Sequence, residues 1–93
     1  MIVGTVRLRL HLPEVRSLKE KRQLVTSLMA RMRNRFGVSV AEVDDLDAWQ
    51  AATLGVACVS GSDAVCRHLL DDLVRWVEIA GPHVVLEATR DAR

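Results

Sequence analysis

The spacing of apolar residues changes repeatedly along the chain, and this succession of periods constrains the fold more than any other feature. From residue 2 to residue 12, apolar side chains occupy mainly the even positions and alternate with polar ones, which is typical of a half-buried strand. Ser17 and Glu20 then form a capping box, which predicts a helix that begins at Leu18 and ends at Gly37. The predicted buried stripe of this helix is Leu18, Val25, Leu28, Met29, Met32 and Phe36.

Four further segments follow with the same two periods. A short strand is expected over residues 38–43, where Glu42 interrupts the alternation and indicates an edge strand or a bulge. A third strand is expected over residues 52–60, and a second helix after Ser62 that stops before Pro82. A last strand covers residues 84–88. The second helix is expected to bury Val65, Leu69, Leu73, Trp76, Val77 and Ala80.

The resulting order is β-α-β-β-α-β, which predicts a ferredoxin-like α+β sandwich: a four-stranded antiparallel sheet with two helices on one face. Residues 1–93 are expected to form one such domain, because the chain is too short for a second one. Crossover handedness places the first and third strands at the centre of the sheet. The open face of the sheet is therefore expected to carry Thr5, Arg7, Arg9, His11, Thr53, Ala57 and Val59.

No enzymatic function is predicted, since the chain contains no phosphate-binding loop, nucleophile elbow or paired metal-ligand spacing. We accordingly expect no catalytic residue, cofactor, metal site or small-molecule substrate. The acidic residues Asp44, Asp45 and Asp47 lack the alternation, glycine and final glutamate of a calcium loop, so a solvated turn is expected. The three histidines, His11, His68 and His83, are expected on the surface or on a strand face.

Neither a secretory leader nor a membrane span is expected. Arg7 interrupts the first apolar stretch, and the longest uncharged run, residues 48–62, is too short and too polar to cross a bilayer. A cytoplasmic protein without membrane contact is therefore predicted. Cys58 and Cys66 lie in apolar periodic segments, where buried free thiols are the usual occupants.

The net charge of +1 conceals two oppositely charged halves. Residues 1–35 contain nine basic and two acidic residues, a net charge of +7, whereas residues 36–93 contain four basic and ten acidic residues, a net charge of −6. A local basic field attracts anionic partners whatever the total charge of the chain.

The basic residues gather at the start of the first predicted helix, where the helix dipole disfavours them by about 0.3–1 kcal/mol each. Free backbone amides and flexible cations at such a position can bind phosphate. A solvated basic helix whose long side chains cover apolar surface is the alternative, and cations of the first strand can also face acids of a second subunit. The predicted anion- or nucleic-acid-binding residues are Arg7, Arg9, Arg16, Lys19, Lys21, Arg22 and Arg33.

The few aromatic residues limit how RNA can be recognised. Phe36 and Trp76 belong to helix stripes, and no strand carries an aromatic side chain on which bases could stack, so RNA contacts are expected to be made to backbone or shape. Trp49 follows the acidic loop and is expected to anchor that loop in the core rather than to stack on a base.

The chain resembles the YlxP-like family of small bacterial proteins over nearly its whole length. The resemblance rests on residues 1–4, the run Arg16-Ser17-Leu18-Lys19-Glu20-Lys21-Arg22, and residues 34–36, 38–44, 49–50 and 54–57. It implies a ferredoxin-like fold and a bacterial cytosolic setting, often with genes for a translation initiation factor and a ribosome-binding factor nearby. It implies no activity and no site residues.

Two functional hypotheses from different classes follow. The first is a non-enzymatic binding module of translation or ribosome assembly that contacts structured RNA or a ribosomal subunit through phosphate contacts of the first helix and strand. The second is a homodimeric protein-interaction module that binds no nucleic acid and pairs through its open sheet face. A metal or small-molecule sensor built on the acidic loop is a weaker third hypothesis.

Overall fold

The computed structural model describes the backbone of residues 1–92 and the side chains of residues 1–90. Arg93, which the predicted domain includes, lies outside the described residues. The order of elements confirms the predicted ferredoxin-like α+β architecture. The elements are β1 (Ile2–His11), α1 (Leu18–Phe36), β2 (Ser39–Asp44), β3 (Ala51–Ser60), α2 (Asp63–Ile79) and β4 (Val84–Ala92).

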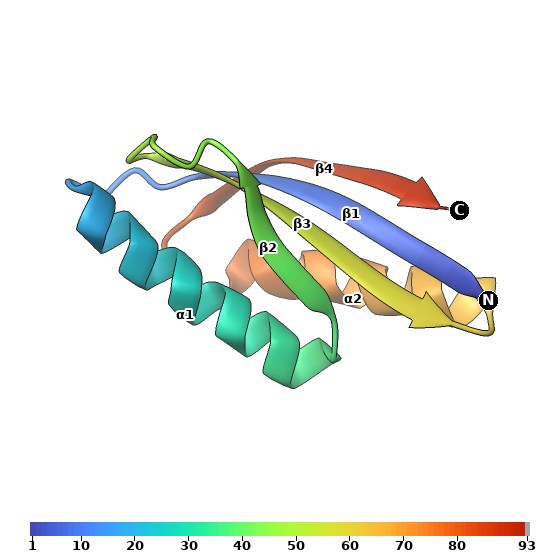
Figure 1. Cartoon of the computed structure of the whole chain (residues 1–93). Coiled ribbons are helices and arrows are strands. Elements are labelled where there is room, and N and C mark those ends of the chain that lie inside the picture. The colour runs from blue at the N-terminus through green and yellow to red at the C-terminus, as the bar shows by residue number, and fades with distance from the viewer. Residues whose placement is uncertain (93) are drawn as a thin grey trace.

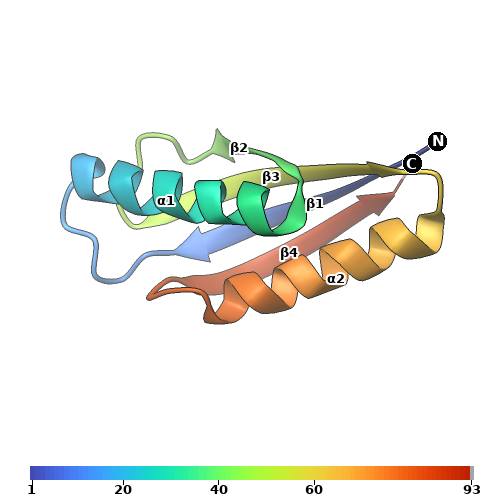
Figure 2. The same ribbon diagram turned by 90° about the horizontal axis from the view of Figure 1, so that it is seen from below.

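The sheet is antiparallel throughout, with strand order β2-β3-β1-β4, so that β1 and β3 are central as predicted. Both helices lie under one face of the sheet and leave the other face open (Figures 1 and 2). Thr5 is the register partner of Ala57 and Arg9 is the partner of Thr53, so these side chains share one face. Alternate residues of β1 point to the helices and are buried there: Val6, Leu8 and Leu10.

The limits of α1 follow from its caps. The hydroxyl of Ser17 accepts a hydrogen bond from the amide of Glu20 at 3.1 Å, and the Glu20 carboxylate accepts one from the amide of Arg16 at 3.4 Å. At the other end, Gly37 takes a left-handed conformation with φ 64°, which favours glycine, and its amide donates to Arg33 O. The capping residues predicted from the sequence are therefore confirmed.

The edge strand β2 contains the bulge that Glu42 indicated. Its register against β3 shifts between Glu42 and Asp44, so Val43 is the extra residue of the bulge and has no register partner on β3. The Val43 side chain is exposed and lies over Gly55 on the open face, where an added Cβ would stand 2.9 Å from a Val43 methyl group.

The buried side of α2 also differs in part from the prediction. Cys66, Leu70, Leu73 and Val77 form the buried stripe at helical spacing, while Val65 is exposed and Leu69 is only half-buried. Trp76 packs edge-on against Phe36 at 5.7 Å between ring centroids, at the contact between the two helices. Several apolar positions in this segment fit two neighbouring stripes, and only packing against the sheet selects one.

The length and apolarity of the two helices can be compared with what a membrane-spanning helix requires. Within residues 1–92, no helix is both long enough and apolar enough to cross a membrane.

Candidate nucleic-acid interface

Two of the backbone amides in the first turn of α1 have partners within the protein. The amide of Glu20 is taken by the Ser17 hydroxyl, and the amide of Lys21 donates to the Ser17 carbonyl at 3.1 Å. No hydrogen bond among the described residues uses the amides of Leu18 and Lys19, so these two amides and the surrounding cations remain of the expected phosphate site.

Three of the predicted cations at this position are exposed: Arg16, Lys19 and Arg22. Their side chains make no hydrogen bond or ion pair with any residue whose side chain the structure describes. A shallow groove of about 550 Å³ runs along the outer side of α1 from this cluster. Lys19 and Arg22 stand at one end, and small residues that permit close approach of a ligand line the rest: Thr26, Ser27 and Ala30, together with Gln23. We call Arg16, Lys19 and Arg22 the α1 basic cluster.

Lys21 does not belong to this cluster, which corrects its prediction as an anion-binding residue. It lies on the buried stripe with Val25, Leu28 and Met32 and has no exposed surface. Its ammonium group donates to the carbonyl of Asp45 at 2.6 Å and to that of Leu46 at 3.4 Å. It also forms an ion pair with the Glu42 carboxylate at 2.8 Å. Helical periodicity turns this position towards the sheet, where the loop after β2 supplies acceptors.

Two other predicted binding residues have partners within the protein. The Arg7 guanidinium forms an ion pair with Asp44 at 3.1 Å, and both side chains remain exposed. Arg33 donates to the carbonyl of Val40 at 2.9 Å and so joins the end of α1 to β2. Arg9 is exposed on the open face beside its register partner Glu87 on β4. Thus the structure separates these cations from the α1 basic cluster.

The acidic loop between β2 and β3 is a largely exposed turn, as predicted, and side-chain hydrogen bonds also hold it in place. The Asp45 carboxylate accepts a hydrogen bond from the Thr53 hydroxyl at 2.6 Å, and Asp45 itself has a positive φ of 59°. Asp44 accepts from the Asp45 amide and pairs with Arg7. The loop therefore folds over one end of the open face and buries Thr53, which was expected to be exposed there.

Trp49 is exposed, so its prediction as the core anchor of this loop is wrong. Its exposed fraction is 55%. The neighbouring Gln50 anchors the loop instead: its side-chain amide donates to the carbonyls of Pro13 and Val15, at 3.3 and 3.1 Å. Its backbone carbonyl accepts from the Leu12 amide at 2.9 Å, with the His11 ring 3.1 Å away. No local pattern distinguishes a glutamine of this kind, because its partners are 35 or more residues away.

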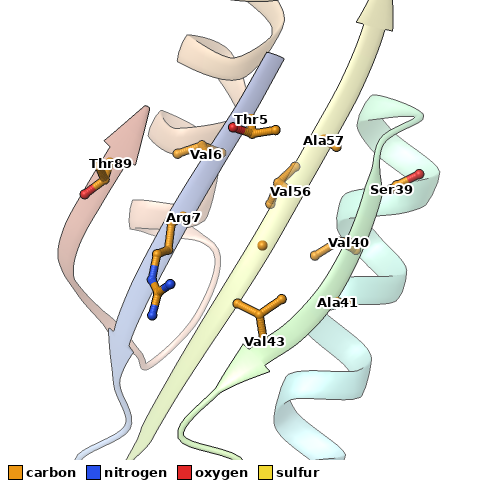
Figure 3. Close-up of a pocket in the computed structure, with 11 residues that line it drawn as sticks. Thr5, Val6, Arg7, Ser39, Val40, Ala41, Val43, Val56, Ala57 and Thr89 are labelled. Carbon is orange, nitrogen blue, oxygen red and sulfur yellow. The ribbon is translucent and has the colours of Figure 1, made fainter. Parts of the chain in front are cut away.

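The open sheet face holds a wide hollow of about 680 Å³ (Figure 3). Small or apolar residues of β2 and β3 form much of it: Ala41, Val43, Gly55 and Ala57. Arg7 and the hydroxyl-bearing Thr5, Ser39 and Thr89 complete the lining around them. The hollow lies on the side of the sheet away from the helices and away from the α1 basic cluster.

Both thiols and one of the three histidines, His83, lie in the interior. Cys58 and Cys66 are buried and free, as predicted, and Cys66 Sγ lies 3.7 Å from the Cys58 carbonyl oxygen. Burial, followed by the neighbouring Cys66 thiol, raises the pKa of Cys58 from 9.0 to about 11. His83 was expected on the surface or on a strand face but is buried next to the start of β4, with its Nε2 2.6 Å from the Val77 carbonyl.

Comparison with known proteins gives two matches. The sequence profile of DUF503, described as a "Protein of unknown function", matches residues 3–90. A protein of Bacillus subtilis (strain 168) named "Uncharacterized protein YlxP" is 34% identical over 62 residues, which make up 67% of this chain and 67% of that protein.

Proposed function

The chain belongs to the DUF503 family, and we propose that it is a cytoplasmic, non-enzymatic binding module that contacts structured RNA or a ribosomal subunit through phosphate groups. The α1 basic cluster carries this proposal. Arg16, Lys19 and Arg22 are exposed and have no partner among the described side chains, and Lys19 and Arg22 line one end of a groove. Exposed, flexible cations of this kind neutralise phosphates and release counterions. The gene neighbours that the resemblance implies agree with a role in translation or ribosome assembly.

The charges of the two helices support α1 as the binding element. Helix α1 contains six basic residues and one acidic residue, whereas α2 contains two basic and four acidic ones. On α2, Arg67 and Arg75 pair with Asp63 and Asp72 of the same helix. The two helices lie side by side under the sheet (Figure 2), so α1 presents the positive part of this surface.

The test measures affinity for ribosomal RNA and for isolated ribosomal subunits over a series of salt concentrations. Wild-type affinity is expected to fall with salt at a log–log slope of about 0.7–0.9 per neutralised phosphate. Replacing Lys19 and Arg22 together by Gln should weaken binding. It should also reduce that slope by the contribution of up to about two phosphate contacts. The matched control, Arg67→Gln with Arg75→Gln, removes the same charge from α2 and should leave binding nearly unchanged. Binding that ignores salt, or equal losses in both double variants, would contradict the proposal.

The open face favours a second candidate function, a homodimeric interaction module. The hollow in Figure 3 is lined by the small residues Ala41, Gly55 and Ala57, which a second sheet can approach closely. Arg7 and Arg9 of β1 are the cations that could pair with acids of a second subunit across a two-fold axis. Arg7 already pairs with Asp44 of its own chain, so Arg9 is the better candidate.

Light scattering at tens of micromolar protein tests the dimer. A dimer with an association free energy of about −8 kcal/mol is largely formed at this concentration. A dimer is expected for the wild type and a monomer for Ala57→Glu, which places a charge in the hollow. His68→Glu adds the same charge on the exposed side of α2 and should leave the dimer intact. A wild-type monomer would contradict this candidate.

A further inference from the structure

Trp49 is a large aromatic side chain on the surface of a loop that the protein holds in place. The indole is 55% exposed, and Leu46 of the same loop is 56% exposed. Single exposed apolar residues are common on protein surfaces. An exposed tryptophan on a fixed loop is different, because tryptophan supplies a large rigid contact surface with little entropy to lose on binding.

Contacts on both sides of Trp49 fix the loop. On one side, the buried Lys21 ammonium binds the carbonyls of Asp45 and Leu46, and the Asp45 carbonyl also accepts from the Ala48 amide at 3.1 Å. On the other side, Gln50 makes the hydrogen bonds to Leu12, Pro13 and Val15. The exposure of Trp49 is therefore a property of an anchored loop and not of a loose one.

The same contacts bring Trp49 close to the α1 basic cluster, although 33 positions separate it from Arg16 in the sequence. Gln50 directly follows Trp49, and Val15 directly precedes Arg16; these two neighbours are joined by the hydrogen bond at 3.1 Å. Both views of the ribbon place the start of α1 and the β2–β3 loop at the same end of the molecule (Figures 1 and 2). An exposed tryptophan side chain and cations without a partner among the described side chains thus lie at the same end of the molecule.

We propose that Trp49 is a stacking platform for an unpaired base, and that Arg16 and Lys19 contact the phosphates beside that base. Single-stranded nucleic acid is bound by this combination of an aromatic face and a positive surface along the backbone. The inference rests on the proposed RNA-binding function and adds that the RNA segment at this end of the protein is single-stranded. The sheet, which carries no aromatic side chain, has no part in the stacking.

The experiment uses the intrinsic fluorescence of Trp49 in a Trp76→Phe background, with a ten-nucleotide oligouridine and an RNA duplex of equal length as probes. Oligouridine should quench Trp49 and bind more tightly than the duplex. Trp49→Ala should weaken oligouridine binding about 5- to 150-fold, the range for one stacked base, without changing the salt slope. Trp49→Phe should retain part of the affinity. Because the side chain is exposed, these variants are expected to fold, which circular dichroism checks.

The outcomes separate this inference from the proposed function. Salt-dependent RNA binding that falls in Lys19→Gln with Arg22→Gln but is unchanged in Trp49→Ala, without quenching, would overturn the stacking platform and leave the proposed function standing. Loss of binding to ribosomal subunits in Trp49→Ala, with oligouridine binding unaffected, would also overturn it and indicate a protein partner. Absence of salt-dependent RNA binding in the wild type would overturn both.

Discussion

At the scale of single residues, Lys21 and Trp49 occupy the opposite environments from those that their side chains favour. A lysine is almost never fully buried without partners, and here its ammonium group donates to Asp45 O and Leu46 O and forms an ion pair with the Glu42 carboxylate. The tryptophan that follows the same loop is exposed. Burial of a charge and exposure of an aromatic ring each cost stability, and residues that break local rules in this way tend to mark functional regions.

Cys58 provides a pH-dependent prediction at the same scale. Burial, then Cys66, raises its pKa in the folded state from 9.0 to about 11. The folded protein therefore holds this proton more tightly than the unfolded chain does, so the contribution to stability is complete below pH 9 and is lost as the pH rises through 11. We expect the free energy of unfolding to fall by up to about 1.4 kcal/mol per pH unit in this window.

Urea denaturation between pH 8 and pH 11 measures this dependence. The matched variant is Cys58→Ala, whose stability should fall less steeply with pH. The comparison is between the slopes of the free energy of unfolding against pH. The loss of stability caused by the smaller alanine side chain is the same at every pH and does not change the slope. Parallel curves for the wild type and the variant would show that Cys58 does not titrate as described.

At the scale of elements, Lys21 links α1 to the bulged end of β2 and to the β2–β3 loop. Beyond Glu42, the register of β2 against β3 shifts, and the loop leaves the sheet. The bonds from Lys21, Thr53 and Gln50 hold this segment over the end of the open face. The position of Trp49 therefore depends on a contact between a helix and a loop that lie 24 residues apart.

Replacing Lys21 by Met is expected to lower the free energy of unfolding by about 3–5 kcal/mol, because it leaves the largely buried Glu42 carboxylate without its cation. Lys19→Met, on the exposed side of the same helix, should change stability by no more than about 0.5 kcal/mol. Adding Glu42→Leu to Lys21→Met should recover much of the loss, since an apolar pair can replace a buried ion pair. Chemical denaturation monitored by circular dichroism provides the values; similar losses in Lys21→Met and Lys19→Met would refute this role.

At the scale of the whole molecule, folding redistributes the two charged halves of the sequence. Arg7 and Lys21 of the basic half are paired with Asp44 and Glu42 of the acidic half. The positive charge that remains available is concentrated on α1, and the acidic excess includes α2, beside it under the sheet. The net charge of +1 therefore does not predict the sign of the electrostatic potential at a binding surface, nor where on the molecule that surface lies.

The fold and most of its boundaries could be predicted from sequence because they depend on local periods and caps, but β4 continues to Ala92, beyond the predicted end at residue 88. The alternation from residue 2, the Ser17 capping box and the left-handed Gly37 each act over a few neighbouring residues, and each appears in the structure at the expected place. The bulge in β2 was indicated by Glu42 in the same way. Periodicity was weaker evidence for α2, where apolar residues on neighbouring stripes left the buried side undetermined.

The ferredoxin-like order of elements and the gathering of cations at the start of α1 follow from the amino-acid sequence alone. Which of those cations are available follows from the packing of the elements: Lys21 faces the sheet and binds the β2–β3 loop, whereas Arg16, Lys19 and Arg22 face solvent. The packing also decides that Gln50, not Trp49, anchors that loop. The physical reason is that a capping box or a strand period is satisfied within one segment, while a buried charge or an exposed ring depends on partners brought together from distant parts of the chain.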